Sequence, residues 1–175
     1  MHALPAFDCS ALFDALNEQR RAAGLDWNQL AAVLWQQSSE LNARRGDSPL
    51  CPGAVPRFGQ RGDISCQYAM FVLRWIDRVP EEFLTGPVVD VGTSRLPKAG
   101  PDRRLRWSLD ELHADLNRRR VEEGLTWVGL GQVIGCTPSR LTNLRTARLA
   151  DMDLAMRVTQ WLGRPAATYI HPAQW

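Results

Sequence analysis

Apolar residues recur three and four positions apart through most of the chain, and this spacing predicts amphipathic α-helices. The clearest example places Leu109, Leu112 and Leu116 on one side of a helix. Apolar and polar residues do not alternate convincingly anywhere within the helical regions, so strands are not expected there. We therefore predict an all-α fold.

The helical pattern occurs twice. When the sequence is shifted by 100 positions, the segment ALNEQRRAAGLDWNQLAAVL aligns with ADLNRRRVEEGLTWVGLGQVI. The residues that recur unchanged are Leu16, Asn17, Arg20, Gly24, Leu25, Trp27, Leu30, Val33, Ser39 and Leu41. Further along, the offset falls to 86, and Ala69, Met70, Val72 and Trp75 match Ala155, Met156, Val158 and Trp161. Duplication of one unit is the simplest explanation.

The repeat divides the chain into two predicted domains, 4–84 and 107–173. Residues 85–106 lie between them, and their proline and glycine content predicts a linker. The first copy carries 14 extra residues (100 minus 86) within 46–62, a Gly/Pro-rich segment that we interpret as a surface insertion. We expect two tandem bundles of four to five helices.

Helix ends in the second copy are marked by specific residue types. Gly124 ends the first helix, and Thr126 is placed to cap the next one. Gly135 suits a tight turn with positive φ, and Pro138 suits the first turn of a third helix. A helix, a three-residue turn and a second helix form the layout of a helix-turn-helix unit.

The segment GLTWVGLGQVIGCTPSRLTNLRTARLADMDLAMRVTQWLG resembles the phage-repressor/Cro-like (XRE-type) helix-turn-helix family of bacterial transcription regulators. The resemblance covers most of residues 109–170. It implies a compact helical bundle, sequence-specific binding to double-stranded DNA without a cofactor, and a recognition helix that begins at Pro138.

The predicted recognition helix combines polar side chains with basic ones. Asn143 can pair with adenine, and Arg140 or Arg145 can pair with guanine. The candidate DNA contacts are Thr137, Ser139, Arg140, Thr142, Asn143, Arg145 and Arg148. Leu141 and Leu144 should face the interior. The alternative interpretation is an ordinary solvated helix face.

The first copy departs from this pattern. Trp35 stands where the second copy has Gly135, and a bulky residue at positive φ would be strained, so the two turns should differ. Arg44 replaces the inward Leu144 and must find a partner or reach solvent. Weaker DNA-contact candidates are Gln36, Gln37, Ser39, Asn42 and Arg45, with Arg103 and Arg104 at the end of the linker. The first copy either contacts DNA, or braces the second copy, or binds a protein partner or a second copy of the chain.

Net charge is only +2, with 21 basic residues against 19 acidic ones. The charge is −2 over 1–84, +3 over 85–106 and +1 over 107–175, so the middle and second half are better placed to meet phosphate. The composition, 45% hydrophobic and 23% charged, is that of a globular protein.

Other classes of function lack their sequence signals. The chain contains no HExxH, GxSxG, P-loop or Rossmann glycine pattern, so an enzyme is not expected. The four cysteines have no CxxC spacing, so we expect no metal. No export signal or membrane-spanning stretch is found, which favours a cytoplasmic location. The sequence therefore predicts a DNA-binding transcriptional regulator, and the alternative is a protein-interaction adaptor, such as an antitoxin-like partner.

Overall fold

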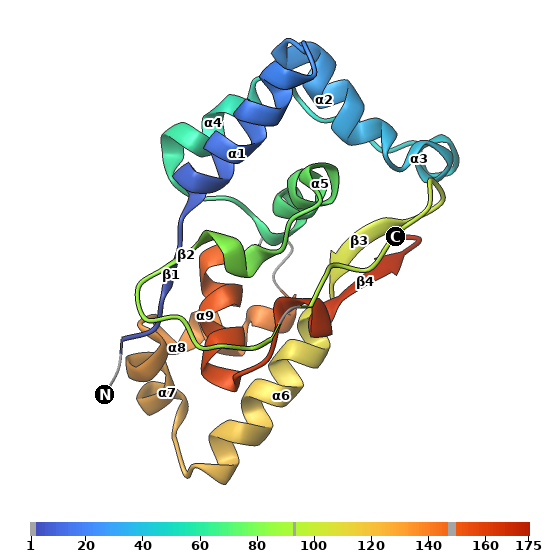
Figure 1. Ribbon diagram of the computed structural model, residues 1–175. Coiled ribbons are helices and arrows are strands. Elements are labelled where there is room, and N and C mark those ends of the chain that lie inside the picture. The colour runs from blue at the N-terminus through green and yellow to red at the C-terminus, as the bar shows by residue number, and fades with distance from the viewer. Residues whose placement is uncertain (1–2, 93, 147–149) are drawn as a thin grey trace.

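The computed structural model describes residues 3–92, 94–146 and 150–175 (Figure 1). The first copy comprises β1 (Ala6–Phe7), α1 (Cys9–Ala22), α2 (Trp27–Gln36), α3 (Ser39–Arg45), α4 (Ala54–Arg61), α5 (Cys66–Ile76), the 3-10 helix η1 (Pro80–Phe83) and β2 (Leu84–Thr85). The second comprises β3 (Arg104–Trp107), α6 (Leu109–Glu122), α7 (Trp127–Ile134), α8 (Pro138–Thr142), η2 (Leu144–Thr146), α9 (Met152–Leu162), η3 (Ala166–Tyr169) and β4 (Ile170–Ala173). The expectation of a mainly helical chain is confirmed.

Two small sheets correct the expectation that strands would be absent. In each copy a strand before the first helix pairs antiparallel with a strand after the last one. Ala6 faces Thr85 in the β1–β2 pair, and Arg104 faces Ala173 in the β3–β4 pair. These strands contain two and four residues, too few for alternation to be recognised in the sequence.

The recurring residues of the two copies make the same local contacts. Arg20 donates hydrogen bonds from Nε and Nη2 to Asn17 Oδ1, and from Nη1 to the carbonyl of Leu25. Its guanidinium lies 4.2 Å from the centroid of the Trp27 ring, a cation–π contact. Arg120 repeats each of these contacts with the equivalent residues of the second copy. The motif therefore fixes the turn after the first helix of each copy.

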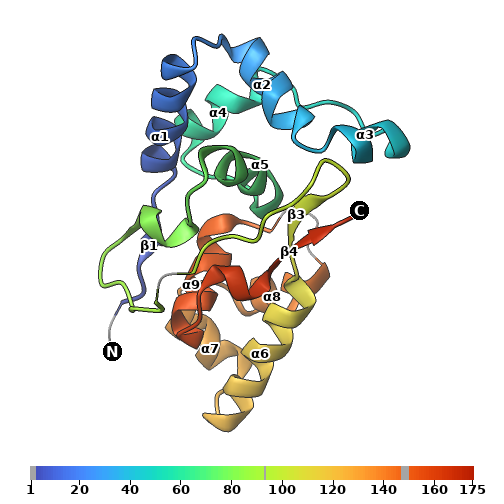
Figure 2. The same ribbon diagram turned by 45° about the vertical axis from the view of Figure 1, so that its right-hand side comes forward.

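Helices α5 and α9 lie at the centre of the molecule, between the remaining helices of the two copies (Figure 1, Figure 2). The segments that lead into them pair with each other. Cys66 N–H donates to the carbonyl of Ala150 at 2.7 Å, and Met152 N–H donates to the carbonyl of Ile64 at 2.9 Å. Ile64 matches Ala150 and Cys66 matches Met152 at the offset of 86, so the two bonds obey an approximate twofold symmetry. This is the self-complementary geometry of a symmetric dimer interface, formed here within one chain.

The strands that open the copies extend this interface. Phe7 N–H donates to Asp153 Oδ1 on α9 at 2.8 Å, and Arg106 Nη1 donates to Gln67 Oε1 on α5 at 3.1 Å. Gln67 and Asp153 are also equivalent at the offset of 86. The buried apolar residues of both copies belong to one continuous cluster.

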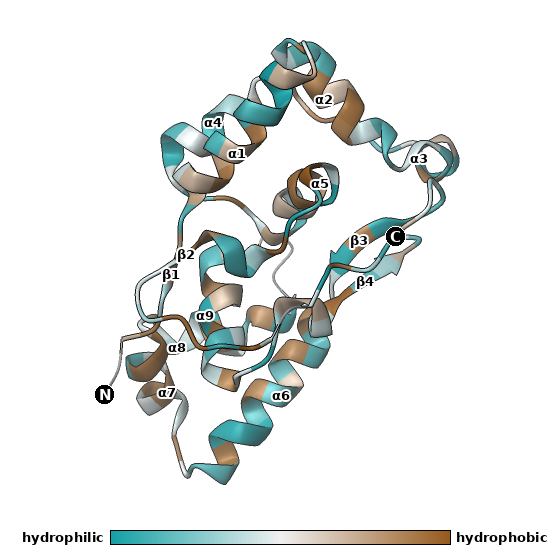
Figure 3. Ribbon diagram, viewed as in Figure 1, coloured by the Kyte–Doolittle hydropathy of each residue, from teal (hydrophilic) through white to brown (hydrophobic). Residues whose placement is uncertain are grey.

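Along α6 apolar and polar residues follow one another in bands, as in an amphipathic helix (Figure 3).

The segment between the copies is bound rather than free. Strands β2 and β3 occupy its two ends, so 86–103 remain as the connecting segment. Arg74 Nη2 donates to the carbonyl of Ala99 at 2.7 Å, and Val89 N–H donates to Gln160 Oε1 at 2.7 Å. The connecting segment is therefore attached to α5 of one copy and α9 of the other, which a flexible linker would not be.

The insertion contains a helix that the sequence pattern did not predict. In α4, Val55 and Phe58 are buried. Gly59 lies directly on the ring of Phe13, and a Cβ at this position would come within 2.5 Å of Phe13 Cγ. Glycine is therefore required for the close approach of α4 to α1. The surrounding proline and glycine residues conceal the apolar spacing of Val55 and Phe58.

Candidate nucleic-acid interface

The turn between α7 and α8 has the expected local chemistry. Thr126 Oγ1 accepts a hydrogen bond from Gly129 N–H at 3.0 Å, which confirms the predicted cap. Gly135 has φ +88°, which confirms the predicted left-handed position. The N–H groups of Gly135 and Cys136 both donate to the carbonyl of Gly131, at 2.7 and 2.9 Å. The end of α7 is therefore closed against the turn.

Gly131 has a steric role that a substitution can test. A Cβ at this position would lie 2.7 Å from the carbonyl oxygen of Cys136, which is backbone and cannot move aside cheaply. We expect Gly131→Ala to lower the free energy of unfolding by about 2 kcal/mol in urea denaturation. Gly129→Ala is the matched control, because its Cβ would be 3.4 Å or more from its neighbours and alanine favours a helix. Equal stability of the two variants would contradict this account of the turn.

Helix α8 and the 3-10 turn η2 divide into a buried and an exposed side. Leu141 and Leu144 are buried, at 0% and 1% exposure. The candidate contact residues on the other side are exposed: Thr137, Ser139, Arg140, Thr142, Asn143 and Arg145. Arg148 lies outside the described residues. The exposed side carries no acidic residue between positions 137 and 146.

The side chains on this surface differ in how far they are already engaged. Thr142 Oγ1 donates to the carbonyl of Ser139 at 3.2 Å, and Arg140 Nη2 lies 3.6 Å from Asp151 Oδ2. Burial, together with the neighbouring Asp153 carboxylate, raises the pKa of Asp151. The side chains of Asn143 and Arg145 form no hydrogen bond or ion pair with another described residue. Both residues are exposed to solvent.

The side chain of Arg157, on α9, binds the backbone of the turn between α7 and α8. Its Nη1 donates to the carbonyls of Ile134 and Gly135 at 2.9 and 3.1 Å, and its Nη2 donates to Asp153 Oδ2 at 2.7 Å. The spacing of Asp153 and Arg157 suggests an ion pair. The sequence gives no sign that the same guanidinium binds two carbonyls distant in the chain, so its role at the turn could not be predicted.

The turn of the first copy differs from that of the second, as expected from Trp35. Helix α2 continues to Gln36, whereas α7 ends at Ile134, and no left-handed residue follows α2. Arg44 is exposed and donates from Nη2 to the carbonyl of Asp102 at 3.3 Å. The N–H groups of Glu40 and Leu41, in the first turn of α3, both donate to the carbonyl of Pro101 in the connecting segment.

Several candidate contacts of the first copy are used inside the chain. Gln37 Nε2 donates to the carbonyls of Leu34 and Phe71, and Asn42 Nδ2 donates to the carbonyl of Trp35 at 2.7 Å. Arg45 and Arg103 pair with nearby acids, at 2.7 Å from Asp47 and 3.8 Å from Asp102. Gln36 and Ser39 remain exposed.

Arg104 does not fit its predicted role. Its side chain is only 7% exposed, with Nη1 2.9 Å from Asp47 Oδ2 and Nη2 2.7 Å from Asn42 Oδ1. The guanidinium also lies 4.7 Å from the centroid of the Trp35 ring. A buried guanidinium with these partners cannot lie along a DNA backbone, so Arg104 is removed from the candidate interface.

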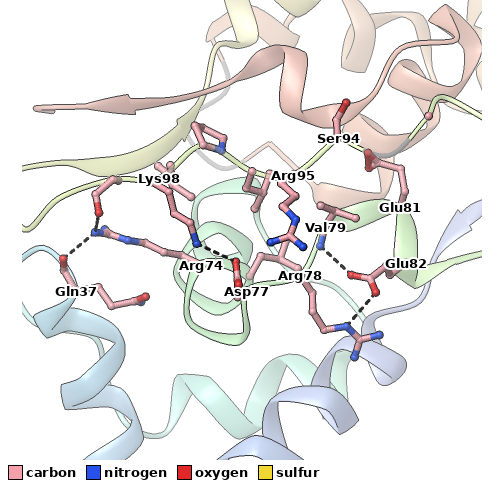
Figure 4. A pocket seen from close by; sticks show the side chains of 16 residues that line it. Gln37, Arg74, Asp77, Arg78, Val79, Glu81, Glu82, Ser94, Arg95 and Lys98 are labelled. Atoms are coloured by element: carbon pink, nitrogen blue, oxygen red, sulfur yellow. Dashed lines mark hydrogen bonds and ion pairs between the residues drawn. The ribbon is translucent and has the colours of Figure 1, made fainter.

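A cavity of about 800 Å³ lies on another part of the molecule, between the end of α5, η1 and the connecting segment (Figure 4). Most of its charged groups are paired: Lys98 lies 3.5 Å from Asp77, and Arg78 lies 3.3 Å from Glu82. Burial raises the pKa of the Glu81 carboxyl, whose Oε1 accepts a hydrogen bond from Ala166 N–H. The Glu81–Ala166 hydrogen bond joins the two copies, and the exposed Lys98–Asp77 pair lies between the connecting segment and the end of α5.

Within the part of the chain that the structure describes, no group of three His, Cys, Asp or Glu side chains could hold a metal ion. Over the same residues, no helix is long and apolar enough to cross a membrane. Comparisons with protein-family models, curated proteins and solved structures gave no match. The α7–α8 unit is therefore the candidate functional site of the molecule.

Proposed function

We propose that this protein is a DNA-binding transcriptional regulator that places α8 in the major groove. The observation that carries the proposal is the exposed side of α8 and η2. It combines free Asn143 and Arg145 side chains with hydroxyls and a further arginine, and it includes no acidic residue. Amide and guanidinium groups on a helix are the usual means of contacting base edges.

We further propose that the second copy alone contacts bases, while the first copy acts as a brace. The approximate twofold symmetry of the copies does not extend to α3, where the connecting segment covers the helix start. Gln37 and Asn42 are hydrogen-bonded inside the chain. One chain would therefore recognise an asymmetric site rather than a palindrome, and no cofactor is required.

The test is a titration of the full-length protein with a mixed-sequence duplex at several salt concentrations. Fluorescence anisotropy measures the binding at each point. Neutralising phosphates releases counterions, so the logarithm of the association constant should fall linearly with the logarithm of salt concentration. For about four phosphate contacts the slope is about −4. Absence of binding at low salt would refute the proposal and favour the protein-interaction adaptor instead. Selection of bound fragments from random DNA would then identify the target sequence.

A further inference from the structure

The insertion of the first copy reaches the candidate interface of the second. A cavity of about 470 Å³ lies between α4 and α8, with Arg57 and Arg61 on the α4 side and Arg140 on the α8 side. The residues Ser65 and Asp151 form an antiparallel β-bridge beside it. This bridge belongs to the central interface of the two copies, and it joins the segment between α4 and α5 to the residue before α9.

Helix α4 is itself held firmly in place. Val55 and Phe58 are buried, and the Phe58 ring lies 5.6 Å from the Phe13 ring in an edge-to-face arrangement. Gly59 allows α4 to approach Phe13 closely. The arginines of α4 therefore extend from a rigid element rather than from a loose loop.

The guanidinium groups around this cavity are only weakly engaged. Arg57 is exposed and makes no ion pair with a described residue. Arg61 lies 3.3 Å from Asp63, but these side chains are 70% and 58% exposed, and such surface pairs contribute little to stability. Arg140 Nη2 lies 3.6 Å from Asp151 Oδ2, and this pair is also partly exposed to solvent. An incoming phosphate could therefore replace both carboxylates.

The cavity wall also carries an unused hydrogen-bond donor. The hydroxyl of Tyr68 is buried and has no hydrogen-bond partner among the described residues. Burial raises the pKa of Tyr68, so the hydroxyl keeps its proton at neutral pH. A buried hydroxyl without a partner costs free energy, so a small rotation of the ring that lets an anionic oxygen in the cavity reach the hydroxyl would be favourable.

From this arrangement we infer that α4 extends the nucleic-acid interface across the boundary between the copies, and that Arg57, Arg61 and the Tyr68 hydroxyl bind a phosphate of the duplex backbone. The inference rests on the proposed DNA binding by α8. It gives the insertion a function: α4 adds phosphate contacts beside the groove that α8 enters. These contacts position the protein without selecting bases.

The experiment compares the full-length protein with Arg57→Ala/Arg61→Ala in salt titrations on both a selected and a scrambled duplex. Because the two arginines neutralise one phosphate, removing both should reduce the magnitude of the salt slope by about 1 and weaken binding to both duplexes equally. Arg57→Lys/Arg61→Lys should restore most of the binding, because a point charge suffices for phosphate. Tyr68→Phe, which removes only the hydroxyl, should weaken binding several-fold.

The charge-matched control is Arg21→Ala/Arg118→Ala, which removes two exposed arginines from α1 and α6. Circular dichroism checks that every variant is folded. Salt slopes equal to that of the control would overturn the role of α4 while leaving DNA binding by α8 intact. Failure of the unaltered protein to bind DNA would instead overturn the proposed function, and the inference with it.

Discussion

Replacing Arg104 with alanine is expected to lower the free energy of unfolding by about 3 kcal/mol, because a buried, hydrogen-bonded side chain that packs on aromatic rings is lost. The guanidinium is buried between the Trp35 ring, Asn42 and Asp47, where it joins α3 and the loop after it to strand β3. Removing it leaves Asp47 without one of its two cationic partners and exposes the faces of aromatic rings. Urea denaturation followed by tryptophan fluorescence measures the decrease in stability.

Two further substitutions test whether stability depends on the specific contacts of Arg104 or falls when any arginine in this segment is removed. Arg103→Ala removes the neighbouring, half-exposed arginine and should change stability by about 0.5 kcal/mol at most. Arg104→Lys should recover only a small part of the stability, because an ammonium cannot stack on Trp35 and bind two partners in one plane. If Arg104→Ala unfolded at the same urea concentration as Arg103→Ala, the buried guanidinium would not be an important link between α3 and β3.

The helices that the two copies share, and their order, could be predicted from the sequence because their determinants are local, whereas α4 could not. The contacts of Arg20 with Asn17 and the Leu25 carbonyl span no more than five residues, and Arg120 repeats them. The glycine at 135 and the cap at 126 likewise act within one turn. The exposed residues of the candidate site follow from the same periodicity, since Leu141 and Leu144 determine which side of α8 is buried.

Long-range contacts could not be predicted in this way. Backbone groups form the symmetric pair of hydrogen bonds that joins Cys66 to Ala150 and Met152 to Ile64. Every residue type has these groups, so the residue types at these positions do not reveal the bonds. A basic run before a domain suggests phosphate binding, and for this reason the sequence alone assigns Arg104 to DNA. Its partners lie about sixty residues earlier, beyond any local pattern. The strands escape sequence-based prediction because their pairing partners lie at opposite ends of each copy.

Replacing Asn143 and Arg145 together with alanine is expected to remove most of the preference for a selected DNA sequence. Both side chains are exposed and lack partners among the described residues, so their removal should leave the fold intact. Deleting a side chain that binds a base edge costs about 1–3 kcal/mol of discrimination between the correct and the wrong base. Anisotropy titrations of a selected and a scrambled duplex, at one fixed salt concentration, measure the ratio of affinities.

The matched control is Asn28→Ala/Arg21→Ala, which removes the same two side-chain types from exposed positions of the first copy. The control should keep the affinity ratio of the unaltered protein, because neither residue lies near α8. Phosphate contacts supply non-specific affinity, so the Asn143/Arg145 variant should still bind the scrambled duplex, though less tightly if Arg145 also meets a phosphate. An affinity ratio that stays unchanged in this variant would show that another surface selects the sequence, and the position assigned to α8 in the groove would be wrong.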